Sequence, residues 1–419
     1  MGTPSSISRR RFLSGVGSAG AALIAACTAP GLVTPGPSAP RSPGVAGSPS
    51  PLPSPSASPV DLRTKIGQML LVGFRGTTAA TAASVLEDIR KRALGGVVLF
   101  SIDQPTGSST RNIESPSQVA ALTAALQAAS LDADAGLPLV ISVDEEGGQV
   151  ARLDPAHGFP ATESAAELGV RDDPAYTQAA AARMAATLAA AGINLNLAPV
   201  VDLNVNPDNP IIGALDRSFS ADPEIVSSEA GAFVMGHHEW QILTTLKHFP
   251  GHGSSAGDTH LGVVDVTDTW SEVELEPFGA LVSNGLADAV LTAHVFNATL
   301  DPEHPATLSH ATITGILRDR LGFDGVVVSD DMQMGAIRDA YGYKDAVRLA
   351  INAGVDILTI ANQQVFEKGI VASTIELVAG MVEGGDITET RIDESWRRIQ
   401  AFKARLRYRR LIGRKYGQL

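Results

Sequence analysis

Between residues 61 and 362, short apolar runs alternate with longer stretches rich in Ala and Leu. The stretches repeat apolar residues at helical spacing, for example at 117–131, 174–191, 223–239 and 308–321. Buried parallel strands that alternate with covering helices produce this pattern. The apolar runs, rich in β-branched residues, occur at 66–74, 95–100, 137–144, 193–203, 242–248, 287–294, 325–330 and 355–360.

Eight strand–helix units in about 300 residues predict an α/β fold of the (β/α)8 TIM-like barrel type, with a doubly wound open sheet as the main alternative. We expect the barrel to span 61–362. The remaining segment, 363–419, has no strand signal and predicts a C-terminal helical extension, with no second sandwich domain. We interpret the bases at its end as a solvated helix face, with a contact to anionic envelope polymers as the alternative. These bases are Arg397, Arg398, Lys403, Arg405, Arg407, Arg409, Arg410, Arg414 and Lys415.

The first 26 residues predict an export signal. Residues 8–13, Ser-Arg-Arg-Arg-Phe-Leu, resemble the twin-arginine consensus, and the apolar run after them is too short for an ordinary membrane span of about 20 residues. The run ends in Ile-Ala-Ala before Cys27, which resembles the lipobox of bacterial lipoproteins. We therefore expect an exported protein, anchored in the cell envelope by a lipid on Cys27. An ordinary cleavable signal with an incidental cysteine is the alternative.

Residues 27–60 predict a spacer. From 28 to 60 the chain holds 10 Pro and a single charged residue, Arg41. Such a segment cannot bury a core, and it would reach about 100 Å if it were fully extended as polyproline.

Composition narrows the function classes. The chain of 419 residues is 44% apolar, which excludes a wholly disordered protein, and its net charge of −13 argues against nucleic-acid binding. Its single cysteine excludes an intramolecular disulfide.

Ionisable residues follow five of the eight predicted strands. Because active sites of such barrels lie at the carboxyl ends of the strands, these residues are expected to converge on one rim. One such residue after a strand is usually a helix cap, but five at one rim indicate a site. The strand-end residues are Asp144, Asp202, Lys247 with His248, His294, and Asp330 with Asp331.

A Gly- and Ser-rich loop follows the fifth predicted strand and contains Asp258-x-His260. In a turn, this carboxylate and imidazole can be neighbours, so that Asp258 orients a ring suited to proton transfer. Idle, exposed positions are expected for four further histidines. These are His237, His238, His304 and His310.

Four ordered motifs resemble the β-N-acetylglucosaminidase (NagZ-like) branch of glycoside hydrolase family 3. They are Lys-His-Phe-Pro-Gly-His-Gly at 247–253 with Asp-Thr-His at 258–260, Asp-Glu-Glu-Gly-Gly-Gln-Val-Ala-Arg at 144–152, Ala-Pro-Val-Val-Asp-Leu-Asn at 198–204 with Arg-Ser-Phe at 217–219, and the segment 317–332 that ends in Ser-Asp-Asp-Met. The resemblance covers roughly residues 61 to 400. It implies a barrel that removes terminal β-linked N-acetylglucosamine from peptidoglycan or chitin-type fragments with retention of configuration.

Carried over by position, the resemblance implies that Asp330 is the nucleophile and that His260, oriented by Asp258, is the acid/base. Asp331 is then a helix cap or a hydrogen-bond partner. Thr259 replaces a usual Ser, and Gln149 replaces a frequent Arg. The residues at sugar-binding positions are Asp144, Arg152, Arg217, Lys247, His248 and, with less support, His294.

Alternative functions remain open at this point. A glycoside phosphorylase could use the same residues, because an imidazole acid/base does not repel phosphate. A β-glucosidase is disfavoured by the Asp-x-His pair and by the missing sandwich domain. A zinc-dependent amidohydrolase would need a His-x-His after the first strand, where this chain has Gly-Phe-Arg, so we expect no metal and no cofactor. A non-catalytic binding lipoprotein is disfavoured because both Asp330 and His260 are present.

Overall fold

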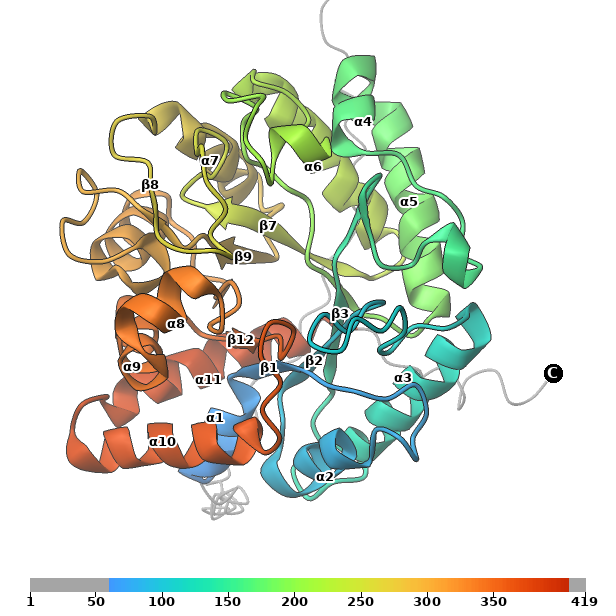
Figure 1. Cartoon of the computed structure of the whole chain (residues 1–419), viewed down its shortest axis with the longest axis vertical. Coiled ribbons are helices and arrows are strands. Elements are labelled where there is room, and N and C mark those ends of the chain that lie inside the picture. The colour runs from blue at the N-terminus through green and yellow to red at the C-terminus, as the bar shows by residue number, and fades with distance from the viewer. Residues whose placement is uncertain (1–59, 407–419) are drawn as a thin grey trace, which may run out of the picture. The chain divides into compact units, whose positions relative to one another are not determined.

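The computed structural model describes residues 60–406, and these residues form the predicted barrel (Figure 1). Eight parallel strands pair in the order β11-β9-β7-β6-β3-β2-β1-β12. The two end strands meet through a parallel bridge between Val328 and Ile357, and the amide of Ser329 donates to the carbonyl of Ile357 at 2.9 Å. The sheet is therefore a nearly closed barrel rather than an open doubly wound sheet. Its strands are β1 (Leu70–Gly73), β2 (Gly96–Leu99), β3 (Val140–Val143), β6 (Leu195–Asn196), β7 (Leu243–Phe249), β9 (Ala289–Thr292), β11 (Val326–Val328) and β12 (Leu358–Ile360).

Helices follow the strands and surround the barrel (Figure 1). Several of them begin with proline directly after a capping residue: the side chains of Ser115, Asp173 and Asp222 each accept a hydrogen bond from the first turn. The helices are α1 (Leu62–Gln68), α2 (Ala83–Arg92), α3 (Pro116–Leu131), α4 (Ala165–Arg171), α5 (Pro174–Ala190), α6 (Pro223–His238), α7 (Glu276–Ser283), the π-helix η5 (Ala311–Arg320), α8 (Gly335–Tyr341), α9 (Tyr343–Ala353), α10 (Ile370–Gly384) and α11 (Glu389–Lys403).

Two short ribbons lie outside the barrel sheet. Strands β4 (Glu145–Gly147) and β5 (Val150–Ala151) form a hairpin after β3, and β8 (Val264–Asp265) pairs with β10 (Val295–Phe296). Every residue of the eight barrel strands is buried, as expected for strands with packing on both faces.

Two predicted strands are shorter than their apolar runs. The first run begins inside helix α1, because Asp61 caps that helix by accepting the amide of Thr64 at 3.1 Å. The run at 193–203 forms ladder pairs only at Leu195–Asn196, and beyond it only Val200 bridges to β7. Pro199 lies in this extended part and has no amide to donate to a ladder.

The segment after the barrel contains the two helices expected there, α10 and α11. Among the described residues, no helix combines the length and the apolar character that crossing a bilayer requires. The expected signal peptide, the spacer to residue 59 and Cys27 lie outside the described residues, as do the bases from Arg407 onward.

Candidate active site

The site residues expected from the sequence gather at the carboxyl ends of the barrel strands. Asp144 directly follows β3, Lys247 and His248 end β7, and Asp330 follows β11. Loops and small elements beyond the strands carry the others at the same end: Arg152 after β5, Arg217 between β6 and α6, Asp258 and His260 between β7 and β8, and His294 between β9 and β10.

Four charges form a buried cluster at β3 and β7. The ammonium of Lys247 lies 2.8 Å from Asp144 Oδ1 and 2.7 Å from Glu146 Oε1. The guanidinium of Arg217 binds the same Glu146 through two nitrogens, at 2.7 and 2.8 Å. Burial raises the pKa of Glu146, but Arg217 and Lys247 outweigh it and hold that pKa well below its usual value. Glu146 therefore fixes two cations at a position where polar sugar groups can meet them.

Replacing Glu146 with Gln should lower the free energy of unfolding by about 3 kcal/mol or more, because it leaves two buried cations with one carboxylate between them. The measurement is urea unfolding at neutral pH. The matched control is Glu376→Gln, which breaks the exposed ion pair with Arg63 and should cost less than about 1 kcal/mol. Similar losses in the two variants would contradict a structural role for the buried cluster.

Asp202 organises the end of β7. Its fully buried carboxylate accepts the Nδ1–H of His248 at 2.6 Å, the amide of His248 at 3.1 Å and the amide of His252 at 2.8 Å. With Nδ1 engaged, the Nε2 of His248 lies 3.4 Å from Arg217. The peptide bonds Lys247–His248 and Phe249–Pro250 are cis. Asp202 thus orients His248, a residue predicted to bind sugar. The sequence placed Asp202 after a strand but did not indicate this role.

The adjacent carboxylates Asp330 and Asp331 have opposite environments. Burial raises the pKa of Asp330, but His294, His248 and His260 outweigh it, so its pKa lies below the usual value. Burial raises the pKa of Asp331 to about 6. The Asp331 carboxylate accepts amides from Gln333 at 3.1 Å and from Ala361 at 2.9 Å. Asp330 is therefore the more acidic carboxyl group of the pair, whereas Asp331 holds the backbone around it.

The Asp258–His260 pair expected from the sequence is present. Asp258 Oδ1 accepts both the Nδ1–H of His260 at 2.7 Å and its amide at 2.8 Å, which is the geometry of a tight turn. About half of the His260 side chain is exposed. The loop lies against the start of α8, where the carbonyl of His260 accepts the amide of Gly335 at 3.3 Å. With Nδ1 fixed, Nε2 is the atom available for proton exchange with a substrate.

Two other predicted residues differ in their freedom to bind a ligand. His294 is completely buried, with Nε2 donating to the carbonyl of Asp331 at 3.0 Å and Nδ1 lying 2.8 Å from Thr307 Oγ1. Neither ring nitrogen is left for a sugar hydroxyl, so His294 supports the residues after β11. Arg152 is half-buried, and its Nε has no hydrogen-bond partner among the described residues.

Glu274 supports the loop after β7 and was not predicted. It is almost fully buried, and its Oε2 accepts the amide of Gly253 at 3.1 Å. The loop approaches so closely that only glycine fits: a Cβ on Gly253 would lie 1.7 Å from the carbonyl oxygen of Leu203, and one on Gly251 would lie 2.6 Å from Glu274 Cβ. Burial raises the pKa of Glu274 to about 7.

An acid whose pKa is raised by folding contributes stability below its unfolded value, near 4.5, and loses it as the pH rises through about 7. Replacing Glu274 with Gln keeps an acceptor for Gly253 but removes the ionisation. The melting temperature of this variant relative to the native protein should rise by a few degrees between about pH 5.5 and about pH 8.5. A difference that does not change with pH would contradict this. Glu274→Ala is the control, because it leaves the amide of Gly253 unpaired and should melt lower at both pH values.

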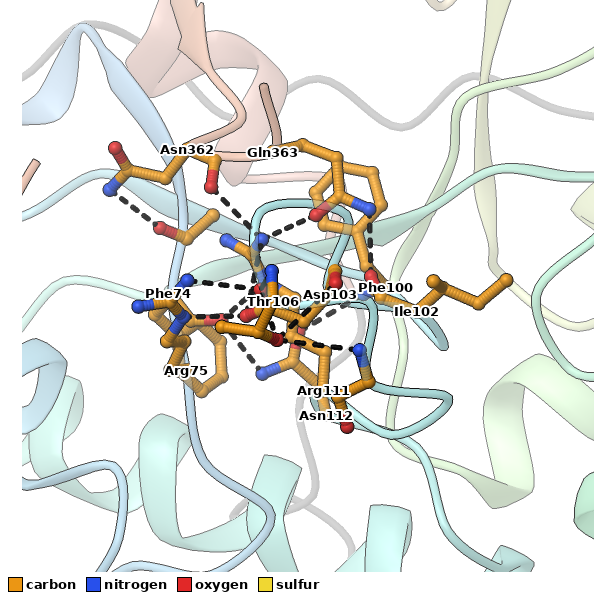
Figure 2. A network of polar contacts seen from close by, with 12 residues as sticks. Phe74, Arg75, Phe100, Ile102, Asp103, Thr106, Arg111, Asn112, Asn362 and Gln363 are labelled. Atoms are coloured by element: carbon orange, nitrogen blue, oxygen red, sulfur yellow. Dashed lines mark hydrogen bonds and ion pairs between the residues drawn. The ribbon is translucent and has the colours of Figure 1, made fainter. Parts of the chain in front are cut away.

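A second buried network closes the rim where β1, β2 and β12 end, as Figure 2 shows. The guanidinium of Arg111 donates to the carbonyls of Phe74 at 2.9 Å, Asn362 at 2.9 Å and Ala361 at 3.1 Å. Burial lowers the pKa of Arg111 to about 10. These carbonyls lie beyond the strand ladders, so Arg111 replaces the partners that the ladders would supply.

At the outer edge of this network, Arg75 binds Asp103 through two nitrogens, at 2.5 and 2.9 Å (Figure 2). The hydrogen bond from Arg75 lowers the pKa of Asp103 to about 2. Polar residues just after the first two strands are the only sequence signal of this network.

Of the histidines expected to be idle and exposed, His310 is exposed, but His237 and His238 both have partners. His238 is half-buried, with Nε2 lying 2.8 Å from Asp288 Oδ2. His237 is completely buried and stacks on Phe233, with Nδ1 bonded to the Phe233 carbonyl at 2.9 Å and Nε2 lying 3.0 Å from the Asn196 side chain. Burial lowers its pKa to about 4. The expectation of an exposed residue is wrong because position 237 follows Phe233 by one helical turn and so shares the inner face of α6.

Across residues 60–406, no group of three or more His, Cys, Asp or Glu side chains is arranged to hold a metal ion.

Comparison with known proteins agrees with this arrangement. Residues 61–402 match the model of the glycosyl hydrolase family 3 N terminal domain. The chain is 40% identical over 319 residues to a β-hexosaminidase from Xylella fastidiosa (strain M23), which covers 74% of this chain and 87% of that protein.

Two solved structures have the same fold. A family 3 β-N-acetylglucosaminidase from Paenibacillus sp. str. FPU-7 superposes with a TM-score of 0.75 at 36% identity, over 83% of this chain; the match spans 62% of that enzyme's length. A β-N-acetylhexosaminidase from Beutenbergia cavernae DSM 12333 superposes with a TM-score of 0.74 at 33% identity, over 82% of this chain and 99% of that one. The chain therefore belongs to glycosyl hydrolase family 3 and is a glycoside hydrolase of the β-hexosaminidase type.

Proposed function

We propose that the chain is a retaining β-N-acetylhexosaminidase that acts through a covalent glycosyl ester on Asp330. The observation that carries this proposal is the contrast between Asp330, which is half-buried and whose pKa three imidazoles hold below the usual value, and Asp331, which is buried, has a raised pKa and holds two backbone amides on its Oδ1. A nucleophile must be ionised and accessible, and Asp330 is both the more exposed and the more acidic of the two carboxyl groups.

In the first step, an oxygen of Asp330 attacks the anomeric carbon while the bond to the leaving oxygen breaks. His260 Nε2 gives its proton to that oxygen, and the imidazole is held in place by Asp258 at 2.7 Å. In the second step, water attacks the ester, the imidazole takes the water proton, and the Asp330 carboxylate is released. The usual pair of carboxylates becomes one carboxylate and one imidazole, as the resemblance implies.

Sugar binding falls to the cluster of Asp144, Lys247 and Arg217, with His248 and Arg152 beside it. The cluster combines fixed carboxylate oxygens with cationic donors, so a hydroxyl or an acetamido group finds both an acceptor and a donor. A sugar that lacks the matching hydroxyl or acetamido group makes fewer hydrogen bonds to these buried charges and is rejected.

The proposed substrates are peptidoglycan or chitin fragments that end in β-linked N-acetylglucosamine. The test incubates the purified protein with muropeptides and with chitobiose, with and without phosphate, and follows the first anomer by proton NMR. Release of the β-anomer at a rate independent of phosphate is expected. The α-anomer as first product would contradict retention, and a sugar 1-phosphate would show a phosphorylase.

We also propose twin-arginine export and lipidation at Cys27, which would place the enzyme in the cell envelope. The support is the sequence of residues 8–27. Mass spectrometry of membrane fractions should find an acylated N-terminus at Cys27. An unmodified protein that begins elsewhere would refute lipidation without affecting the enzymatic proposal.

A further inference from the structure

The acid/base loop, residues 258–263, rests on the segment that follows Asp330. The carbonyl of His260 accepts the amide of Gly335 at 3.3 Å. One position earlier in the loop, the carbonyl of Thr259 accepts the amide of Ala336 at 3.2 Å. Both donors belong to the first turn of α8, where amides have no partner within their own helix. The loop therefore supplies the acceptors that these two buried amides need.

The donors of these two bonds have a fixed position relative to Asp330. Gly335 lies only five positions after Asp330 in the sequence. Between them, Met332 is completely buried, and its amide donates to the carbonyl of Thr359 in β12 at 3.0 Å. The acid/base loop is thus held by the same anchored stretch of chain that carries the Asp330 carboxylate.

A third donor reaches the acid/base loop from the segment after β12. The side-chain nitrogen of Gln364 donates to the carbonyl of His260 at 3.4 Å. That carbonyl therefore accepts hydrogen bonds from two elements of the barrel. The imidazole of His260 has a separate partner, because Asp258 holds its Nδ1 at 2.7 Å. The position of Nε2 consequently depends both on where the backbone of His260 rests and on how Asp258 turns the ring.

Gly335 leaves no room for a side chain against this loop. A Cβ at position 335 would lie 2.9 Å from the carbonyl oxygen of His260 and 3.1 Å from the carbonyl carbon of Leu261. The backbone of Gly335 does not itself require glycine, because its φ is not positive and because alanine is the better residue inside a helix. A methyl group at this position therefore has one steric consequence, which is to push the acid/base loop away.

The loop can yield to such a push because its other side is open. Leu261 is 83% exposed and Val263 is 58% exposed. Between them, a Cβ on Gly262 would meet no described atom within 4 Å. A side chain at position 335 should therefore displace the loop outward and leave the packing of the barrel unchanged.

We propose that Gly335 is a positioning residue for the acid/base: the absence of a side chain lets His260 rest at the distance from Asp330 that proton transfer requires. The inference rests on the proposed function, because Gly335 acts only through His260. A group that is misplaced by about 1 Å can cost about a hundredfold in rate. The cost falls on substrates whose leaving group needs the proton, since the nucleophile and the sugar-binding cluster are not moved.

The first test compares kcat/KM for chitobiose and for a nitrophenyl glycoside in Gly335→Ala. The chitobiose value should fall about tenfold or more, and the nitrophenyl value should fall less than about threefold. The nitrophenyl group departs without a proton, so this substrate reports folding and sugar binding. The matched control is Gly380→Ala on α10, where an added Cβ would meet no described atom within 4 Å. Both of its rates should stay within about twofold of the native values.

The second test places Gly335→Ala in a His260→Ala background. With the imidazole gone there is no acid to misplace, so the added methyl group should change kcat/KM for chitobiose less than about twofold. A general structural defect would lower the rate equally in both backgrounds. Gln364→Met provides an independent variant if Gly335→Ala does not fold. It removes one donor to the His260 carbonyl and should lower kcat/KM for chitobiose about threefold, with the nitrophenyl value unchanged.

Three results would overturn the proposal. They are equal losses on the two substrates in Gly335→Ala, native rates on both substrates, and a tenfold loss on chitobiose that persists in the His260→Ala background. Should the decision fall to Gln364→Met, equal losses or native rates in that variant have the same meaning. A failure of the proposed function looks different, because His260→Ala alone would then lose the same factor on both substrates.

Discussion

Replacing Asp330 with Asn should reduce kcat on a β-linked chromogenic N-acetylglucosaminide by about 10⁴-fold or more. The amide cannot form the glycosyl ester, and it carries no charge to stabilise the cation-like sugar in the transition state. The measurement is the steady-state rate at neutral pH, with the melting temperature as the check on folding.

Asp331→Asn is the matched control for this variant. Asp331 Oδ1 accepts the amides of both Gln333 and Ala361, and the Oδ1 of an asparagine can take its place but, being uncharged, accepts them more weakly. The control should therefore melt lower while losing much less rate than Asp330→Asn. Near-normal turnover by Asp330→Asn, or a larger loss in the control, would contradict the assignment of the nucleophile.

Replacing His260 with Ala should slow substrates with poor leaving groups by about 10³-fold and should slow activated aryl glycosides far less. A leaving group that is already acidic does not need the proton that His260 supplies. The measurement compares kcat/KM for chitobiose with kcat/KM for a nitrophenyl glycoside.

His157→Ala is the control for His260. His157 forms a similar pair with Asp154, at 2.8 Å, but belongs to a short helical turn outside the cluster of predicted site residues. It should leave both rates within about twofold of the native values. Equal losses on both substrates in His260→Ala would count against its role as the acid.

The fold was predictable because its signal is repeated along the whole chain. Eight buried parallel strands need eight apolar runs, and each run marks its strand even when the ladder is shorter. The boundaries were less predictable, since they depend on single residues. Asp61 caps a helix at the start of the first run, and the ladder of the fourth run stops at Asn196 although the apolar residues continue.

The site was predictable where a residue acts from its own strand end or loop. Asp258 and His260 are two positions apart, so their contact follows from local geometry. Glu146, Glu274 and Arg111 were missed, and Asp202 was placed at the rim without a specific role, because their roles depend on partners from other elements. Arg111, for example, reaches carbonyls 37 and 251 positions away along the chain.

His237 and His294 also show that the environment of a side chain is hard to predict when it depends on other elements. A buried, hydrogen-bonded imidazole and an exposed one look alike in a single sequence. Only the packing of α6, or the position of Thr307 beside His294, separates them.

Trapping the glycosyl-enzyme shows which residue carries the sugar. The protein is incubated with a 5-fluoro-N-acetylglucosaminyl fluoride, digested and sequenced by mass spectrometry. One sugar adduct, on Asp330, is expected in the native protein and none in Asp330→Asn. An adduct on Asp331 or another residue, or steady turnover with no adduct and an inverted product, would contradict it.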